Sequence, residues 1–288
     1  MPRLASLLRL ALIATGLFGS LSAHALELQL KDKIVLVTGS TSNIGYATAR
    51  LFLREGATVI VNSNEQSAVD EAVARLTKET GRKPLSFTAD VTSAQDIGRL
   101  VAAHPRVDVL VNNVGGMIPF EFVKSTDKQW DDSWQLNVMS GVRLSRHYLP
   151  GMRERNWGRI VFISSESGLQ IPTESIAYGA VKAAVIATAR GLAEINAGTN
   201  VTVNSVLPGP TWDREGPRAK ASLERSGAKT FEEMEKNFLK DRRPTSILQR
   251  FGSPDEVAAL IVYTSSALAS ATTGAALRVD GGVVKSAF

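Results

Sequence analysis

Short apolar runs alternate with amphipathic segments along the chain from residue 26 onward. Apolar runs rich in β-branched residues predict buried strands. The expected strands are residues 33–38, 57–61, 84–88, 107–112, 158–164, 199–207 and 275–279. Apolar positions at helical spacing predict the intervening helices, at residues 43–55, 67–80, 93–103, 126–152, 177–196 and 253–266. Strands regularly separated by helices form parallel sheets covered on both faces. The pattern therefore predicts an α/β fold: a single doubly wound domain over residues 26–288, with a seven-stranded parallel sheet and helices on both faces.

Composition fits a folded domain of this kind and excludes several other classes. The chain has 288 residues, of which 44% are hydrophobic and 21% charged, unlike a disordered, collagen-like or multi-pass membrane protein. Its net charge of +5 is small and not clustered, so no nucleic-acid partner is expected. It contains no Cys and only three His, so we expect no disulfide, no thiol nucleophile and no metal site.

Residues 1–25 form a separate segment. Arg3 and Arg9 precede an apolar run at residues 10–21, and Ala23-His24-Ala25 follows. A basic start, a short apolar middle and a small-x-small end predict a secretory signal peptide. The run is shorter than the about 20 apolar residues that span a bilayer, so no stable membrane span is expected in the mature chain. Two alternatives are an organelle-targeting segment and a mis-assigned start, with the real chain beginning near Leu26. We expect an exported, periplasmic protein if the signal is real and a cytoplasmic one otherwise.

The turn after the first expected strand is a candidate phosphate-binding loop. It has the sequence TGSTSNIG at residues 38–45 and lies between a strand and a helix. Gly39 permits a sharp turn and Gly45 a close approach of helix and strand, while the helix N-terminus offers free N–H groups to a pyrophosphate. Asn43 replaces the usual middle glycine, and Asn is the side chain that best tolerates left-handed backbone angles. An ordinary turn is the alternative.

The end of the second expected strand bears on the choice between NAD and NADP. In NAD-specific folds an acid here binds the ribose 2′-hydroxyl, whereas this chain has Asn62-Ser63-Asn64, with Glu65 one residue further on. The side chains expected to donate hydrogen bonds to a 2′-phosphate are Ser40, Thr41, Ser42, Ser63 and Asn64. No nearby Arg adds a charge-assisted bond. The balance favours NADP, and a polar loop without a discriminating role is the alternative.

Three side chains form the candidate chemical centre. Tyr178 and Lys182 are four residues apart and share one face of a helix. Ser165 ends the fifth strand, where the catalytic groups of open α/β sheets gather. A phenol has a pKa of about 10, which a nearby ammonium and an oxidised nicotinamide both lower. We therefore expect Tyr178 to protonate a carbonyl oxygen as hydride arrives, or to deprotonate an alcohol in reverse.

In these features the chain resembles the short-chain dehydrogenase/reductase family, over nearly all of residues 26–288. The matching motifs occur in the family's order and are TGSTSNIG at 38–45, Asp90-Val91, NNVG at 112–115, Asn137, ISSESG at 163–168, YGAVK at 178–182, NSVLPGPT at 204–211 and VDGG at 279–282. The departures are Asn43 for Gly and Val114 for the family's usual Ala. A closer resemblance is to the bacterial 3-oxoacyl-(acyl-carrier-protein) reductase-like members. It implies a Rossmann domain, a small-molecule substrate and a homotetramer built partly on the two long helices.

The resemblance also implies roles for individual residues. It makes Tyr178 the general acid/base and Ser165 the hydroxyl that orients the substrate carbonyl. Lys182 would bind the nicotinamide ribose and lower the Tyr178 pKa, and Asn137 would hold a water in the proton relay. Asp90 would lie at the adenine, and residues 208–211 beside the nicotinamide carboxamide. The cofactor-binding residues expected from the loop and the resemblance are Gly39, Ser40, Thr41, Ser42, Asn43, Ile44, Gly45, Ser63, Asn64, Asp90, Val91, Asn113, Gly115, Tyr178, Lys182, Pro208, Gly209 and Thr211.

Two acids and a polar stretch surround this centre. Glu166 and Glu174 lie between Ser165 and Tyr178. An acid beside Ser165 could select a substrate amine or hydroxyl, or couple to the proton relay, but solvated loop positions are the norm for acids. Residues 211–250, with a helix expected at 231–240, predict a lid over the substrate. Such lids exclude water around hydride transfer.

The sequence therefore predicts an NAD(P)-dependent oxidoreductase that transfers hydride between a nicotinamide and a ketone or secondary alcohol, working reductively in the manner of 3-oxoacyl-ACP reductases. One alternative is an alcohol, sugar or steroid dehydrogenase working oxidatively. The other is a non-catalytic NAD(P)-binding regulator, because a fold does not guarantee catalysis. A regulator has no reason to retain Tyr178 and Lys182 together, so the intact catalytic set argues against it.

Overall fold

The computed structural model describes residues 26–216 and 219–287, so the predicted signal segment lies outside the described residues. One seven-stranded sheet forms the centre of this part of the chain. Its strands are β1 (Ile34–Val37), β2 (Thr58–Ser63), β3 (Leu85–Thr88), β4 (Val109–Asn112), β5 (Gly158–Ile163), β6 (Val201–Pro208) and β7 (Ala276–Val279). Each falls within or beside the strand expected from the sequence.

The strand order is β3-β2-β1-β4-β5-β6-β7, and all neighbouring strands are parallel. From β1 the chain winds outward to β3 and then returns to β4 and winds outward in the other direction. The order reverses between β1 and β4, and in open parallel sheets ligands bind in the crevice at the carboxyl ends of such strands. The prediction of a doubly wound seven-stranded sheet is confirmed.

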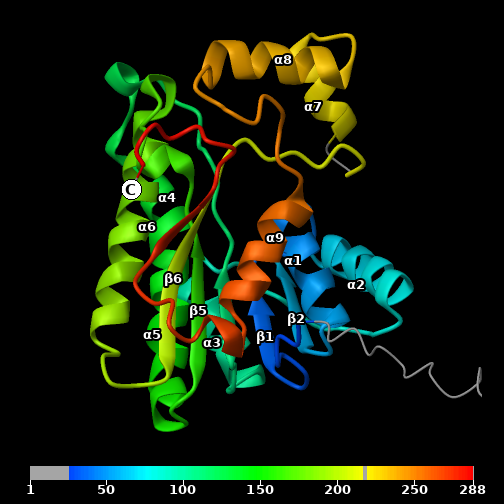
Figure 1. Ribbon diagram of the computed structural model, residues 1–288, viewed down its shortest axis with the longest axis vertical. Coiled ribbons are helices and arrows are strands. Elements are labelled where there is room, and N and C mark those ends of the chain that lie inside the picture. The colour runs from blue at the N-terminus through cyan, green and yellow to red at the C-terminus, as the bar shows by residue number, and fades with distance from the viewer. Residues whose placement is uncertain (1–25, 217–218, 288) are drawn as a thin grey trace, which may run out of the picture.

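Helices cover both faces of the sheet (Figure 1). They are α1 (Asn43–Arg54), α2 (Gln66–Thr80), α3 (Ala94–Ala103), α4 (Asp127–Trp134), α5 (Ser140–Glu154), α6 (Ile176–Glu194), α7 (Ala219–Ser226), α8 (Phe231–Arg242) and α9 (Pro254–Thr264). Helices α1, α2 and α9 enclose one apolar core, which Val35 and Val37 of β1 enter. Helices α3, α5 and α6 enclose the other, which Leu36 enters. The alternation follows from the period of two along a strand.

The long helix expected at residues 126–152 is interrupted rather than uniform. Helix α4 begins after Thr126, whose side chain and that of Gln129 form a capping box. A π-helical turn, Gln135–Met139, then joins α4 to α5. Such turns insert a residue into a helix and often occur at functional sites. This one contains Asn137, so the interruption falls at one of the predicted catalytic residues.

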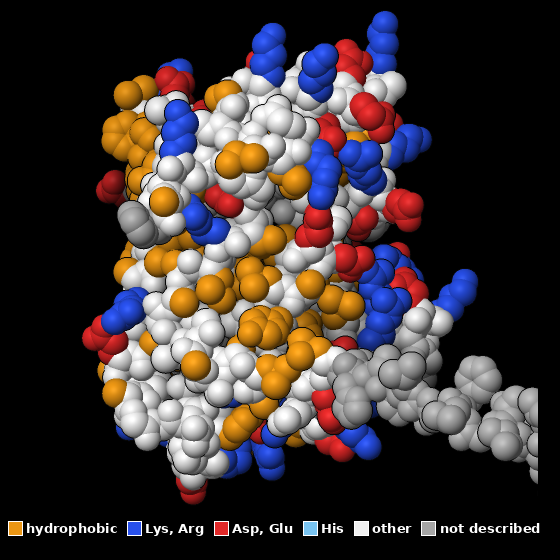
Figure 2. Space-filling model, in the orientation of Figure 1, with side chains coloured by type: hydrophobic (Ala, Val, Ile, Leu, Met, Phe, Trp, Pro, Cys, Tyr) orange, Lys and Arg blue, Asp and Glu red, His pale blue; other side chains and the backbone are white. Residues whose placement is uncertain are grey.

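Residues 211–250, which we call the α7–α8 segment, lie beyond the carboxyl ends of the strands (Figure 1). The two ends of the segment meet, because Trp212 N–H donates to Gly252 O at 2.9 Å and Gly252 N–H donates to Pro210 O at 2.8 Å. Its apolar side chains form a small core of their own around Met234, Leu239 and Phe251. Charged side chains crowd its outer surface (Figure 2). The segment is thus a separately packed unit joined to the sheet at a narrow neck.

One helical stretch among the described residues, Thr173–Glu194, is long and apolar enough to cross a membrane by length and composition alone. Its Val181, Val185 and Ala189 pack in the core against the sheet. A core helix passes the same test, so this finding by itself indicates no membrane span.

Candidate active site

The β1–α1 loop has the backbone expected of a phosphate-binding turn. Gly39 has φ +61°, and Asn43, at the position of the missing glycine, has φ +49°. A Cβ on Gly45 would lie 2.4 Å from Gly39 O, so only glycine allows helix and strand to approach this closely. The N-cap residue Ser42 makes no side-chain capping bond and the first turn of α1 has no acid. Its free N–H groups suit a phosphate, because helix N-termini attract anions.

Neighbouring strand ends hold this loop in place. Asn113, directly after β4, donates through Nδ2 to Thr38 O at 2.8 Å and Gly39 O at 3.2 Å. Asn62, at the end of β2, accepts from Gly39 N–H at 3.4 Å. The structure thus gives Asn113 a supporting role under the loop, and it adds Thr38 and Asn62, which sequence reasoning did not select.

Ser40 corrects one prediction about the cofactor. Its side chain is fully buried, donates to Val37 O at 2.7 Å and accepts from Asn62 N–H at 3.0 Å. The hydroxyl is therefore committed to the protein's own backbone and is not a free donor for a 2′-phosphate. Asn64 is exposed, and Thr41, Ser42 and Ser63 are half-buried.

The predicted Asp90-Val91 pair follows β3 after Ala89, at the carboxyl end of the sheet. Val91 is buried. Asp90 Oδ1 accepts from Thr92 N–H at 2.8 Å and from Thr92 Oγ1 at 2.7 Å, which forms a tight turn. The Asp90 backbone N–H donates to Asp96 Oδ2 at 2.9 Å, so a local network shapes this end.

Ser165, Tyr178 and Lys182 come together at the end of β5, as the sequence predicts. Ser165 is 6% exposed, and it lines the same cavity as Tyr178. Lys182 is 3% exposed, and its Nζ lies 5.6 Å from the centre of the Tyr178 ring. The Lys182 ammonium donates to Ile163 O at 3.0 Å, which fixes it at the end of β5.

The pKa of Tyr178 differs from the prediction. Burial raises it most and the Glu166 charge adds to this, whereas the Ser165 hydroxyl and the Arg243 charge lower it, and the net result is a pKa of about 12 instead of 10.0. Lys182 is not among the groups that shift the Tyr178 pKa here, so the lowering expected from Lys182 and an oxidised nicotinamide stays a prediction. Burial lowers the pKa of Lys182 itself to about 8, so its ammonium is poorly stabilised where it lies.

Asn137 and Gly115 adjoin Lys182. The Asn137 side chain binds the backbone of Gly116 on both sides, since Oδ1 accepts from Gly116 N–H and Nδ2 donates to Gly116 O, each at 3.0 Å. A Cβ on Gly115 would lie 2.8 Å from both Asn137 Oδ1 and Lys182 Nζ. The absence of a side chain at Gly115 thus lets Asn137 and Lys182 pack directly against its backbone.

Pro208 ends β6, and Gly209 and Thr211 follow it. A Cβ on Gly209 would lie 2.5 Å from Asp280 O, so glycine is required for contact with the C-terminal turn. Thr211 Oγ1 donates to Gly209 O at 3.0 Å, and Thr211 pairs with Gly252 at the neck of the α7–α8 segment. This strand end therefore joins the crevice to that segment.

A cavity of about 1070 Å³ opens onto Ser165 and Tyr178. Apolar side chains from residues 117–123, together with Ile176 and Phe238, form much of its wall. Its charged lining residues include Glu166, Glu174 and Arg243. The cavity lies next to the phosphate-binding crevice, as a reaction between a dinucleotide and a small molecule requires.

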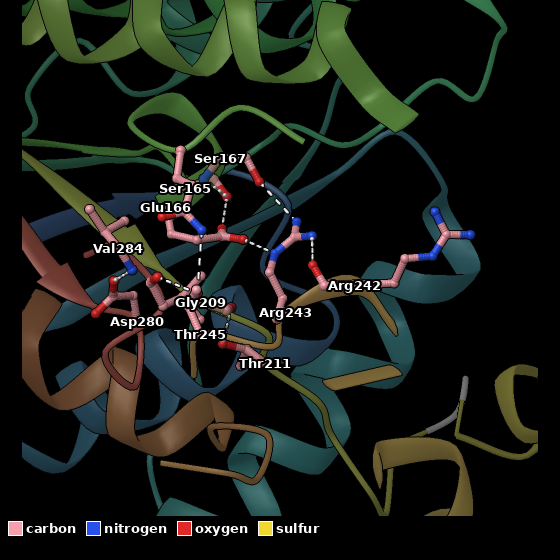
Figure 3. A network of polar contacts seen from close by, with 12 residues as sticks. Ser165, Glu166, Ser167, Gly209, Thr211, Arg242, Arg243, Thr245, Asp280 and Val284 are labelled. Carbon is pink, nitrogen blue, oxygen red and sulfur yellow. Dashed lines mark hydrogen bonds and ion pairs between the residues drawn. The ribbon is translucent and has the colours of Figure 1, made fainter. Parts of the chain in front are cut away.

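Glu166 is buried, not solvated as the default interpretation held. It is 3% exposed, and Arg243 Nε donates to its Oε1 at 2.6 Å (Figure 3). Glu174 is exposed, as expected of a loop acid, and pairs with Arg242 at 3.4 Å. Sequence reasoning missed Arg243, because no local pattern connects it to a residue so distant in the chain.

Taken together, a phosphate-binding turn at the sheet's switch point and a Ser–Tyr–Lys cluster beside a cavity define a dinucleotide-dependent oxidoreductase. Residues 39–284 match the family model described as Enoyl-(Acyl carrier protein) reductase. The chain belongs to the short-chain dehydrogenase/reductase family. This confirms the predicted family and, at the level of the family, the prediction of an NAD(P)-dependent oxidoreductase that acts on carbonyl or hydroxyl groups.

Individual relatives agree with this assignment. The chain is 42% identical over 269 residues to "Uncharacterized oxidoreductase YvrD" of Bacillus subtilis, covering 91% of this chain and 100% of the relative. It is 31% identical over 261 residues to the 3-oxoacyl-[acyl-carrier-protein] reductase FabG of Thermotoga maritima, covering 89% and 100%. Among solved structures, L-sorbose reductase from Gluconobacter frateurii, complexed with NADPH and L-sorbose, superposes with a TM-score of 0.82 at 28% identity, covering 91% and 100%.

Proposed function

We propose that the protein is an NADPH-dependent reductase of ketones that carry an apolar group. The observation that carries the proposal is the cluster of Ser165, Tyr178 and buried Lys182, in which Ser165 and Tyr178 line a cavity and Lys182 lies behind the Tyr178 ring. The free N–H groups at the start of α1 and the left-handed backbone of Gly39 and Asn43 fit a bound dinucleotide.

In this proposal each residue of the cluster has one task. Tyr178 delivers its phenolic proton to the carbonyl oxygen, and Ser165 contacts the same oxygen to orient the ketone. Lys182 binds the ribose, and its positive charge stabilises the phenolate left after proton transfer. Asn137 anchors the Gly115–Gly116 backbone beneath the site and contributes to the proton relay. The reduced nicotinamide, when bound, supplies the hydride.

The choice of cofactor and substrate rests on separate observations. The NADPH complex of L-sorbose reductase supports NADPH, as does the lack of an acid at Ser63 and Asn64. The apolar wall formed by Phe120, Ile176 and Phe238 supports an acyl or aromatic ketone in preference to a sugar. In this respect the proposed substrate is closer to that named for FabG.

Purified protein should be assayed with NADPH and NADH against acyl, sugar and aromatic ketones. We expect consumption of NADPH with an acyl or aromatic ketone. In Tyr178→Phe, turnover should fall by about 10²- to 10⁴-fold, the range for loss of a general acid, with NADPH affinity retained. Undiminished turnover would remove Tyr178 from the mechanism. Tight NADPH binding without activity on any ketone would favour a regulator instead.

Two finer features complete the proposal. The chain assembles as a homotetramer, for which the groove of about 560 Å³ on α5 and α6, lined by Val142, Leu192 and Ile195, offers an apolar contact. Light scattering of Ile195→Asp, expected to give smaller species than the parent protein, tests this.

The segment 1–25 is removed on export. The intact mass of native protein tests this: a chain that starts at Leu26 supports removal, and a chain that starts at Met1 contradicts it.

A further inference from the structure

Glu166 and Arg243 have no part in the reaction proposed above, yet Glu166 contacts Ser165 and Arg243 contacts Glu166. Glu166 has a side chain that is 4% exposed, and that of Arg243 is 13% exposed. Arg243 Nε holds one carboxylate oxygen at 2.6 Å, and the Ser165 hydroxyl donates to the other (Figure 3). Burying two charges costs free energy that their attraction does not always return. A buried pair that contacts the catalytic serine therefore calls for a role beyond stability.

The hydrogen bonds of Ser165 show how Glu166 constrains its hydroxyl. A serine hydroxyl has one proton to donate and two lone pairs that accept. The carboxylate of Glu166 can only accept, so the Ser165 proton lies on the Glu166 side. Ser167 N–H donates to Ser165 Oγ at 3.1 Å and occupies one lone pair. Only one lone pair then remains, and it can accept from the Tyr178 hydroxyl or from the hydroxyl of an alcohol, so Glu166 fixes the rotation of the Ser165 hydroxyl.

Arg243 in turn fixes Glu166 from a different part of the chain. It directly follows α8, and its Nη2 also donates to Ser167 Oγ at 3.3 Å. Two residues on, Thr245 donates to Val283 O at 2.6 Å and accepts from Gln170 at 3.3 Å. The connection that follows α8, residues 243–250, is thus hydrogen-bonded to the loop that carries Ser165.

We propose that Glu166 and Arg243 are positioning residues: Glu166 sets the orientation of the Ser165 hydroxyl, and Arg243 fixes Glu166 and balances its charge beside Tyr178. This inference rests on the proposed function of Ser165 and Tyr178. Because Arg243 belongs to the α7–α8 segment, the reaction centre is complete only when that segment is in place. The segment therefore contributes to the chemistry as well as to the wall of the cavity.

Electrostatics gives the two partners opposite effects. The charged groups that lie near Tyr178 or line the cavity are Lys182, Glu166, Arg243, Glu174, Arg242 and Glu121, while Arg190 and Glu194 of the same helix lie two or more turns further on and pair with each other. Of these, the Glu166 charge raises the pKa of Tyr178 and the Arg243 charge lowers it. Removing Glu166 must therefore lower the Tyr178 pKa, and removing Arg243 must raise it. A purely structural role would not produce these opposite shifts.

The test uses oxidation of the alcohol formed from the best ketone of the assay panel, with NADP as oxidant. Oxidation needs the phenolate, which the positive charge of the oxidised nicotinamide favours, so activity rises with pH through the Tyr178 pKa of the NADP complex. Glu166→Gln should shift this rise to lower pH and Arg243→Met to higher pH, each by about one unit, as expected for a charge close to a titrating group. The double variant should lie between them. Turnover at the plateau should fall by about 10-fold or more, since the hydroxyl is less well oriented.

Arg243→Lys covers the case in which Arg243→Met folds poorly. It keeps the positive charge and loses the Nε bond, so the plateau should fall while the pH of the rise stays within about 0.3 units. Controls are Glu224→Gln and Arg225→Lys, which change exposed residues of α7 and should leave both readouts unchanged. Shifts of Glu166→Gln and Arg243→Met in the same direction, or no shift in either, would overturn the inference.

Amide hydrogen exchange, measured without substrate, separates this inference from the proposed function. Arg243→Met should raise exchange both at residues 165–169 and at the end of α8, because Arg243 bonds Glu166 and Ser167 to that end of the helix. An active enzyme with unchanged exchange and unshifted pH profiles overturns the positioning role alone. A parent protein inactive on every ketone overturns the proposed function, and this inference with it.

Discussion

The two ends of the crevice are built in different ways. At the cofactor end, Gly39, Asn43 and Gly45 shape a loop whose bonds run between backbone atoms and uncharged side chains. At the substrate end, Arg242 and Arg243 at the end of α8 form ion pairs with Glu174 and Glu166 in the wall of the cavity. The cofactor end is fixed by neighbours on adjacent strands, whereas the substrate end depends on a separately packed segment. Recognition of a common cofactor thus rests on the rigid sheet, and recognition of a particular substrate on the part that is easiest to alter.

Gly45→Ala should disrupt the phosphate-binding loop at the cofactor end and have the largest effect, which is on NADPH affinity. The added Cβ would lie 2.4 Å from Gly39 O and 2.6 Å from Asn113 Nδ2, so the loop backbone must move. We expect NADPH affinity to fall by about 100-fold, since displacement of about an ångström in a preorganised site has effects of this size. Titration of NADPH fluorescence measures it. Gly98→Ala is the control: nothing lies within 4 Å of that position, and it should stabilise α3 by about 0.5–1 kcal/mol.

Lys182 lies where the two ends meet, and Lys182→Met should change how stability depends on pH. The Lys182 pKa is lowered from 10.5 in the unfolded chain to about 8 in the fold, so between these values the unfolded chain binds more protons. The free energy of unfolding therefore rises with pH across this window, by up to roughly 3 kcal/mol. Urea unfolding at pH 8 to 10 should show this slope in the parent protein and its loss in Lys182→Met. Equal slopes of the free energy of unfolding against pH in both proteins would contradict a lowered pKa of the buried Lys182.

Trp212→Ala should weaken the substrate end alone. Trp212 stacks on Phe251, with ring centres 5.7 Å apart, inside the small core of the α7–α8 segment. We expect the ketone KM to rise by about 10-fold and exchange to increase within residues 231–251, since this unit opens locally. NADPH affinity should stay unchanged. Leu268→Ala, at an exposed apolar position remote from the segment, is the control. A loss of NADPH affinity equal to the loss of ketone affinity would show that the ends are not independent.

Asn43→Gly should give the smallest effect. Asn43 already has φ +49°, which glycine adopts without strain. We therefore expect NADPH affinity within about 2-fold of the parent protein, whereas Asn43→Ala should lose about 1 kcal/mol of stability at this backbone angle. Thermal unfolding and NADPH titration of both variants measure the difference. A large gain in affinity for Asn43→Gly would show that the asparagine distorts the loop.

The same contrast explains what the sequence could predict. The strands and the loop residues Gly39, Asn43 and Gly45 follow from local patterns of apolar and glycine positions, and the structure places them as expected. The Ser40 hydroxyl was assigned to a ligand because sequence does not show that it is buried against Val37 O. The Glu166–Arg243 pair joins residues 77 apart in the chain. No local spacing encodes such a contact, since it depends on how the α7–α8 segment folds back.

The pairing of Thr211 with Gly252 brings the two ends of the α7–α8 segment into hydrogen-bonding contact. An insertion whose start and finish adjoin can be lengthened, shortened or exchanged for another without moving the scaffold on either side. Grafting the corresponding stretch of a relative between these two positions should consequently transplant its substrate preference while the nucleotide preference of the recipient stays the same. Thr211 and Gly252 thus mark the two positions between which the α7–α8 segment can be exchanged, in the laboratory or in evolution.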